Sequence, residues 1–189
     1  MKPSVVKIEI THKRWASMSI ASIRMPDGRI ILRDVEDHGH AAAVLPYDPM
    51  RRTALLVEQL RAAALIAAGA TQTLEAIAGL VEGQDDPMDT ARREALEEGG
   101  LRLGALEHVA TAWSTPGVST ERMALYLAER RAGDRVGQGG GVAHEEEEVR
   151  VVEIGLKELA ALMAAESIVD MKTLVLVQAL RLRRPDLFD

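Results

Sequence analysis

The segment from Gly79 to Leu101 is unusually rich in acidic residues. Seven of these 23 residues are acidic, and Glu94 and Glu98 are four positions apart. On a helix, side chains at this spacing share a face, and two like charges there destabilise the helix by roughly 0.2–0.5 kcal/mol. A hard divalent cation, which binds carboxylate oxygens, would remove that repulsion. A solvated acidic helix face is the alternative interpretation.

A short strand and a helix are expected to position these carboxylates. Residues 73–77 have a strand-like composition and end at the dipeptide 78–79. A helix is predicted over residues 87–98, with Asp85 or Asp86 as its N-cap and a proline at its first position. Two consecutive glycines then end the helix. The acidic segment is therefore predicted to be a strand, a loop and a helix.

The rest of the chain alternates between strand-like and helix-like stretches. Strands are expected at residues 5–10, 17–25, 29–35, 41–45, 54–59, 106–112, 123–128 and 149–154. Two helices are expected at residues 156–165 and 170–183, after a glycine-rich and then acidic loop at 133–148. This order predicts an α+β fold, an α/β/α sandwich with a mixed β-sheet and flanking helices.

Composition and charge narrow the possible classes of protein. The chain has 189 residues, 47% hydrophobic and 28% charged, which fits one globular domain with an N-terminal extension. A net charge of -6 argues against nucleic acid as a partner. The absence of cysteine fits a reducing compartment, so we expect a cytoplasmic protein. The N-terminus lacks a signal peptide and the uncharged run at 62–74 is too short to span a bilayer, so no membrane partner is expected.

The acidic segment resembles the Nudix box, whose pattern is G-x5-E-x7-R-E-U-x-E-E-x-G-U. The matching residues of this chain are Gly79, Asp85, Arg93, Glu94, Ala95, Glu97, Glu98, Gly100 and Leu101. Asp85 is the one departure, because the family has glutamate there. The resemblance implies the Nudix fold, with the box as strand, loop and helix. It also implies metal-dependent hydrolysis of a nucleoside diphosphate linked to another group.

The same resemblance implies roles for individual box residues. Glu94 and Glu98 are expected to ligate the metal together with the backbone carbonyl of Ala78. The metal implied is Mg²⁺, with Mn²⁺ as the alternative. Glu97 and Arg93 are expected to be catalytic residues. They are four positions apart, so they can also form an ion pair on the adjacent helix face.

The late acidic loop is the second region with implied catalytic roles. Its match to the family places Glu147 as a further metal ligand and Glu145 as the general base that activates water. Because residues 145–148 are four consecutive glutamates, each of the two roles could belong to a glutamate one position away. A solvent-exposed loop without a chemical role is the alternative.

The resemblance extends beyond the box to the ADP-ribose pyrophosphatase branch of the family, over about residues 34–180. The segments DHGHAAAVLPYDP, LLVEQLR and LEAIAGLVEG carry it. It implies that Arg61 and Arg33 bind the substrate diphosphate, and that Pro116 and Glu121 of STPGVSTE line the substrate site. An ordinary surface arginine and an ordinary Pro-Gly turn are the alternatives.

Other features resemble the GDP-mannose hydrolase branch. These are the GGGV sequence before the acidic loop and the D-x-K-T-L sequence at residues 170–174. Both branches hydrolyse nucleoside diphosphate sugars. The DHGHAAAVLPYDP segment favours ADP-ribose, with AMP and ribose 5-phosphate as products, and GDP-mannose is the alternative. A catalytically inactive nucleotide sensor is less consistent with three retained box glutamates.

Two domains are expected. Residues 1–38 are predicted to form an N-terminal β extension for dimerisation and substrate binding, and residues 39–189 the Nudix hydrolase domain. The resemblance implies a homodimer with a nucleotide sugar as substrate. The histidines lack the spacing of metal ligands, so structural or hydrogen-bonding roles are predicted for His38, His40, His108 and His144.

Overall fold

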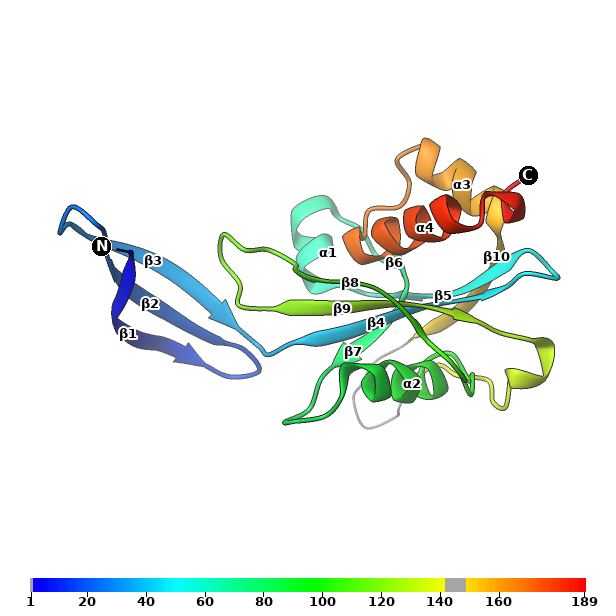
Figure 1. Cartoon of the computed structure of the whole chain (residues 1–189), viewed down its shortest axis with the longest axis horizontal. Helices are drawn as coiled ribbons and strands as arrows, with labels where there is room; N and C mark the ends of the chain where they lie inside the picture. Colours follow the sequence, from blue (N-terminus) through cyan, green and yellow to red (C-terminus); the bar gives the residue numbers. More distant parts are fainter. Residues whose placement is uncertain (1, 142–148) are drawn as a thin grey trace. The chain divides into compact units, whose positions relative to one another are not determined.

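The computed structural model describes residues 2–141 and 149–189, and within them the predicted α+β sandwich is present (Figure 1). A seven-stranded sheet has the order β10-β5-β4-β9-β8, with β6 paired to β5 and β7 paired to β4. Helix α2 lies on one face of this sheet, and α3 and α4 lie on the other (Figure 1). The strands are β4 (Ala41–Asp48), β5 (Thr53–Gln59), β6 (Thr73–Glu75), β7 (Ile77–Leu80), β8 (Glu107–Trp113), β9 (Arg122–Glu129) and β10 (Arg150–Gly155).

The centre of the sheet is strand β4, in which all eight residues are buried. A strand covered on both faces has an almost continuous apolar sequence instead of an alternating one, and AAAVLPY has that character. Helices α3 (Leu156–Ala164) and α4 (Met171–Arg183) bury leucines that are fully inaccessible, including Leu156, Leu176 and Leu180. Among the described helices, none has both the length and the apolarity needed to cross a membrane.

Helix α2 (Pro87–Glu97) begins and ends close to the predicted positions. Asp86 is the N-cap, and its side chain accepts a hydrogen bond from the Met88 N–H at 2.8 Å. At the other end, Gly100 has a φ of +64°, a left-handed conformation that ends the helix. A Cβ at this position would lie 2.4 Å from the Gly137 carbonyl oxygen. The second box glycine is therefore required both by its backbone conformation and by a close backbone neighbour.

A second compact unit contains the residues up to Ala41 together with Thr111–Met123. Its three-stranded antiparallel sheet consists of β1 (Ser4–Lys13), β2 (Ser17–Arg24) and β3 (Ile30–Asp37), in that order. All ten residues of β1 are exposed. The three strands were each predicted from their alternating sequence. The segment Thr111–Met123 joins this unit although it is far away in sequence.

Several parts of the chain differ from the prediction. Helix α1 (Ala62–Ala68) was not predicted, because it has no buried face and so no amphipathic pattern; its alanines favour a helix, and Gly69 ends it with a φ of 68°. The single strand predicted at residues 73–77 is wrong. The chain forms β6 and β7 instead, and changes partner at Ala76, whose N–H donates to Thr173 Oγ1 at 2.6 Å. Two short 3₁₀ helices, Ala132–Asp134 and Pro185–Leu187, were also not predicted.

The Gly100→Ala variant is expected to be less stable than the wild type by roughly 2 kcal/mol, because it combines a left-handed alanine with a backbone clash. For a chain of this size the melting temperature should fall by about 4 °C or more. Gly104→Ala is the matched control, since a Cβ there meets no atom within 4 Å. Equal melting temperatures for the two variants would contradict the requirement for glycine.

Candidate active site

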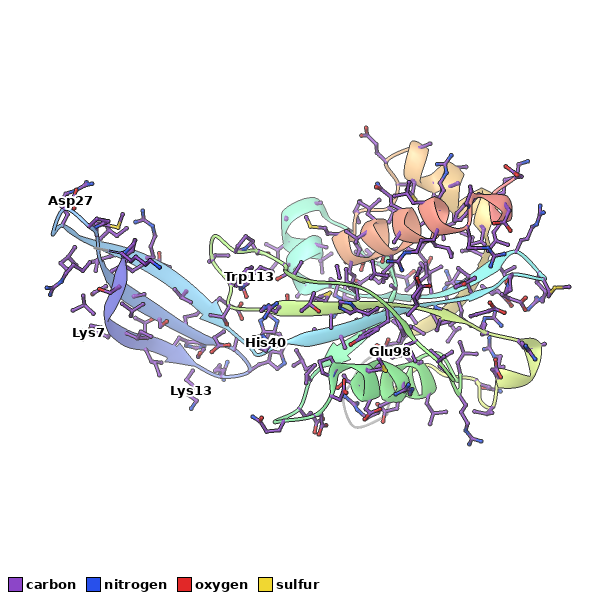
Figure 2. The ribbon with its side chains drawn as sticks, in the orientation of Figure 1. Lys7, Lys13, Asp27, His40, Glu98 and Trp113 are labelled. Carbon is purple, nitrogen blue, oxygen red and sulfur yellow. The ribbon has the colours of Figure 1, made fainter. Side chains whose placement is uncertain are left out.

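The two carboxylates predicted to bind metal lie together against strand β7. Glu94 and Glu98 are only 9% and 4% exposed, and Glu98 lies between α2 and the sheet (Figure 2). The N–H of Ala78 donates to Glu98 Oε2 at 3.4 Å. A Cβ on Gly79 would be 1.8 Å from Glu94 Oε1, so the first box glycine leaves the space that the carboxylate occupies. The box thus brings two buried carboxylates to one short stretch of strand.

Arg93 partly neutralises this acidic face. Its guanidinium contacts Glu94 Oε1 at 2.7 Å and Glu97 Oε2 at 2.8 Å, so the predicted pair with Glu97 is confirmed. A further hydrogen bond runs from Arg93 to the Leu80 carbonyl at 3.4 Å. Burial acts to lower the pKa of Arg93, but the charges of Glu94 and Glu97 outweigh it and raise the pKa. Arg93 therefore ties the acidic helix face to the end of β7.

The carboxylates of this helix face are of the type that binds a hard cation, but the described residues bring too few of them together to form a complete metal site. Buried carboxylates are the ligands that Mg²⁺ and Mn²⁺ prefer. Within residues 2–141 and 149–189, no group of three or more His, Cys, Asp or Glu side chains is placed to hold a metal ion. Glu145 and Glu147 lie outside the described residues. A metal site here would need at least one group in addition to Glu94 and Glu98.

Asp85 replaces the glutamate of the Nudix box and lies in the exposed loop between β7 and α2. Its backbone N–H donates to the Glu82 carbonyl at 2.9 Å. Asp85 thus takes part in the turn that leads to the N-cap of α2.

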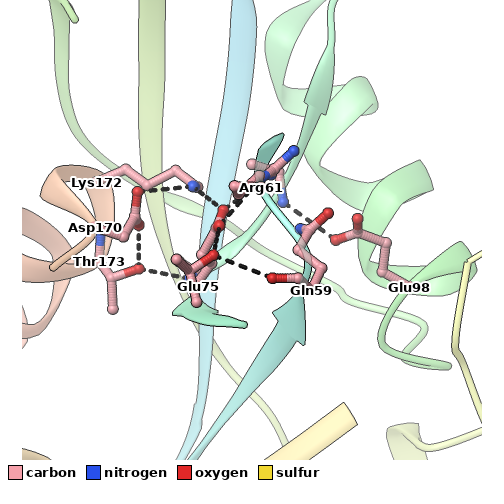
Figure 3. A network of polar contacts seen from close by, with 10 residues as sticks. Gln59, Arg61, Glu75, Glu98, Asp170, Lys172 and Thr173 are labelled. Carbon is pink, nitrogen blue, oxygen red and sulfur yellow. Dashed lines mark hydrogen bonds and ion pairs between the residues drawn. The ribbon is translucent and has the colours of Figure 1, made fainter. Parts of the chain in front are cut away.

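Arg61, predicted to bind phosphate, lies between β5 and α1 and is held by a buried carboxylate (Figure 3). Its Nε and Nη2 atoms each contact one oxygen of Glu75 at 2.9 Å. Glu75 is 2% exposed, whereas the Arg61 side chain is 42% exposed. The arginine is thus fixed from the protein side and accessible from the solvent side.

Glu75 belongs to a larger charge network that was not predicted. Lys172 Nζ contacts Glu75 Oε2 at 2.5 Å and Asp170 Oδ1 at 3.0 Å. Burial opposes ionisation of Glu75, but the hydrogen bond from Arg61 and the charge of Lys172 outweigh it and lower its pKa to about 2. Two sequence features could have indicated this network. One is the single carboxylate, Glu75, within the apolar stretch LEAIAG, and the other is the D-x-K-T-L sequence at the start of α4, which supplies Asp170 and Lys172.

The other predicted substrate residues belong to the N-terminal unit. Arg33 is exposed on β3, where its Nη1 donates to the Leu32 carbonyl at 2.7 Å. Pro116 is exposed in the segment after β8. Glu121 is buried, and its carboxylate contacts His38 Nε2 at 3.3 Å. Among the described contacts, Glu121 therefore has a partner that helps to fix its position.

His38 has the hydrogen-bonding role that was predicted. Its Nδ1 contacts Glu36 Oε1 at 2.5 Å, and its ring stacks on Trp15 with 4.9 Å between centroids. Glu36 also accepts a hydrogen bond from Ser119 Oγ at 2.7 Å. Burial acts to lower the pKa of His38, but the bonds to Glu36 and Glu121 outweigh it and raise the pKa. His38 thus links β3 to the segment that carries Pro116 and Glu121.

The stabilisation by His38 is expected to depend on pH. Because the folded-state pKa is raised above 6.5, the contribution is complete below about pH 6.5 and is lost as the pH rises through the folded pKa. His38→Gln should therefore lower the melting temperature by roughly 2–4 °C at pH 6 and by less at pH 9. Exposed His12 supplies the control, since His12→Gln should not produce such a pH-dependent gap. A gap of equal size at both pH values would contradict the assignment.

The sequence is similar to several enzymes of known name. The profile of the NUDIX domain matches residues 37–173. A GDP-mannose pyrophosphatase of Cronobacter sakazakii is 38% identical over 160 residues, which cover 83% of this chain and 82% of that protein. An ADP-ribose pyrophosphatase of Escherichia coli K12 is 37% identical over 121 residues, which cover 64% of this chain and 57% of that protein.

The fold is also similar to a solved structure. The crystal structure of an ADP compounds hydrolase matches with a TM-score of 0.79, covering 98% of this chain and 96% of the other. The two sequences are 15% identical, so this likeness concerns the fold. The profile match over more than half of the chain, together with a relative aligned over four fifths of it, shows that the chain belongs to the NUDIX family.

Proposed function

We propose that this chain is a pyrophosphohydrolase that hydrolyses the diphosphate bond of nucleoside diphosphate sugars. The observation that carries the proposal is the buried pair Glu94 and Glu98 against Ala78 and Gly79, the arrangement that the box sequence predicts. The names of the related enzymes support the same class of substrate.

Two substrates of this class are candidates. ADP-ribose, hydrolysed to AMP and ribose 5-phosphate, is favoured by the DHGHAAAVLPYDP segment. GDP-mannose is favoured by the length of the match, because the GDP-mannose pyrophosphatase of Cronobacter sakazakii aligns over 83% of this chain and the ADP-ribose pyrophosphatase of Escherichia coli over 64%. The two share the diphosphate, so the same catalytic groups serve either.

Metal binding at the box is part of the proposal. Glu94, Glu98 and the Ala78 carbonyl would hold Mg²⁺, or Mn²⁺ in its place, and Glu147 would complete the ligand set. When bound, the metal supplies charge neutralisation for the diphosphate and acidifies water. The burial of both carboxylates four positions apart on one helix supports this assignment, since a divalent cation would offset the repulsion between like charges.

The protein's own groups would then act on the substrate and on water. Glu145 is proposed to accept the proton of the attacking water, which makes the oxygen a better nucleophile. Arg61 and Arg33 are proposed to orient the diphosphate by paired hydrogen bonds to its oxygens. Arg93 and Glu97 support the catalytic helix through their 2.8 Å contact.

The N-terminal unit is proposed to serve dimerisation and to contribute to substrate binding through Pro116 and Glu121. Several large apolar side chains on its sheet are half or more exposed. Exposure of apolar surface to water is unfavourable in free energy, and it often marks a site of protein–protein interaction. These side chains are Val5, Val6, Ile8, Ile10, Ile30 and Leu32. A second copy of the chain is the proposed partner.

The net charge of -6 and the cysteine-free sequence support a cytoplasmic enzyme that does not bind nucleic acid.

The function is tested by assaying ADP-ribose, GDP-mannose, NADH and 8-oxo-dGTP with Mg²⁺. At least one of the two sugar nucleotides should be hydrolysed to a nucleoside monophosphate, and chelation should abolish turnover. Glu98→Gln should lower kcat/KM by about 100-fold or more, because it removes a charged metal ligand. Asp89→Asn is the matched control, since Asp89 is an exposed carboxylate of the same helix and should be dispensable.

Turnover of neither sugar nucleotide would refute the substrate class. An inactive nucleotide sensor would instead bind ADP-ribose or GDP-mannose without hydrolysing it. If Glu98→Gln kept full activity and metal affinity, the metal assignment would be wrong.

The dimer is tested by light scattering after size-exclusion chromatography. The wild type should have the mass of two chains, and the double variant Ile8→Glu and Ile10→Glu should have the mass of one, because two charges would then replace exposed apolar side chains of β1. Leu182→Glu is the control, since Leu182 is 83% exposed on α4, outside this sheet. A monomeric wild type would refute the proposal.

A further inference from the structure

Glu75 is a buried carboxylate that the proposed reaction does not use directly. It lies at the end of β6 and is 2% exposed. Three side chains bind its two oxygens, namely Thr73 of the same strand, Arg61 and Lys172. A buried charge with this many charge-assisted contacts has a fixed orientation, because moving it would break several of them at once.

The contact between Glu75 and Arg61 fixes the plane of the guanidinium. Nε and Nη2 of Arg61 meet separate oxygens of Glu75, both at 2.9 Å, which is the bidentate geometry of a planar fork on a carboxylate (Figure 3). Such a contact defines both the position and the tilt of the arginine head group. The Arg61 side chain nevertheless remains 42% exposed.

The opposite side of Glu75 is held by the N-terminal end of α4. Lys172 bridges Glu75 and Asp170, and Asp170 caps the helix by accepting from the Thr173 N–H at 3.0 Å. Thr173 Oγ1 in turn accepts the hydrogen bond from the Ala76 N–H. The start of α4 is thus tied to the strand on which Glu75 lies, so the carboxylate is supported from behind.

The four ionised side chains of this network balance one another. Glu75 and Asp170 carry two negative charges, and Arg61 and Lys172 carry two positive charges. Lys172 is mostly buried and contacts both carboxylates, so Glu75 keeps a counter-charge that does not depend on Arg61. The exposed part of Arg61 can therefore approach an anion without leaving Glu75 as an unpaired buried charge.

We propose that Glu75 is a positioning residue, which holds the Arg61 guanidinium in the orientation that receives a phosphate group of the substrate, with Lys172 as its support. The inference rests on the proposed function, in which Arg61 binds the diphosphate. An arginine that is already oriented loses less conformational freedom on binding and so gives tighter binding. The competing possibility is an ion-pair network that only stabilises the fold.

The two possibilities differ in a double-mutant cycle of Glu75→Gln and Arg61→Ala. KM is measured with Mg²⁺ for whichever of ADP-ribose and GDP-mannose the wild type hydrolyses better. Each single variant should raise KM about tenfold and leave kcat within about twofold, as expected for the loss of uniform binding. The double variant should have the KM of Arg61→Ala alone. KM increases that multiply in the double variant would overturn the proposal.

Glu153→Gln is the matched control. Glu153 is also held by two arginines and a threonine, Arg51, Arg130 and Thr53, and it lies on β10 of the same sheet. This variant should lose stability but keep KM within about twofold of the wild type, because no phosphate-binding role is assigned to its arginines. A tenfold rise in KM for this control would show that loss of any such network has the same effect, and would overturn the proposal.

A second variant decides the matter if Glu75→Gln does not fold. Arg61→Lys keeps the charge but cannot form the bidentate contact, and it replaces a partly exposed side chain. Its KM should rise nearly as far as that of Arg61→Ala. A KM close to that of the wild type would mean that charge alone suffices, and positioning by Glu75 would be refuted.

Binding of ADP separates failure of this inference from failure of the proposed function. The dissociation constant of ADP is measured by calorimetry for the wild type, Arg61→Ala and Arg61→Lys. If the wild type hydrolyses neither sugar nucleotide, the proposed function fails, and an approximately tenfold weaker ADP complex in both variants would still support the positioned arginine. Equal ADP affinity in all three proteins would refute it whatever the enzyme hydrolyses.

Discussion

The burial of the Glu94 and Glu98 carboxylates is the constraint on which the rest of the site depends. A charge removed from water must find compensation, or its burial destabilises the fold by several kcal/mol. The chain meets this requirement with an N–H of Ala78, a guanidinium from Arg93 and the absence of a side chain at Gly79. Gly79 and Arg93 are positions of the box, and Ala78 directly precedes it, so these box residues serve to accommodate two buried carboxylates.

The glycine-rich segment at residues 137–141 extends this arrangement at the C-terminal end of α2. The N–H of Gly140 donates to the Glu98 carbonyl at 2.8 Å, and the N–H of Gly141 donates to the Glu97 carbonyl at 3.2 Å. A Cβ at Gly139 would be 2.2 Å from the Glu98 carbonyl oxygen, so no side chain fits between the two backbones. The carbonyls at the end of a helix lack partners within it, and here the loop supplies them. Gly140 and Gly141 therefore lie directly beside the last turn of the helix that carries Glu94 and Glu98.

Features that depend on neighbours in sequence were predictable. The start of α2 follows from Asp86 and Pro87, and the order of strands and helices followed from periodicity. Helix α1 was not predicted because none of its residues is buried, so it has no pattern to recognise. The network around Arg61 and Glu75 could not be predicted from the sequence either. Lys172 is 97 residues from Glu75, and only folding brings the two side chains together. The family resemblance singled out Arg61 as a candidate for phosphate binding, whereas the orientation of its guanidinium depends on tertiary contacts.

Charge balance explains how a net-negative chain can receive a negative substrate. Among the described residues, the face of α2 has three carboxylates, Glu94, Glu97 and Glu98, and the guanidinium of Arg93 contacts two of them, Glu94 and Glu97. A divalent cation, which the proposed function assigns to Glu94 and Glu98, would add positive charge to this face. At Arg61 the four charges of the network balance one another, and the Arg61 side chain remains 42% exposed, so its guanidinium can approach an anion. In the proposed function, the diphosphate of a nucleotide sugar bound to a divalent metal would meet both groups, the metal at Glu94 and Glu98 and a phosphate at Arg61.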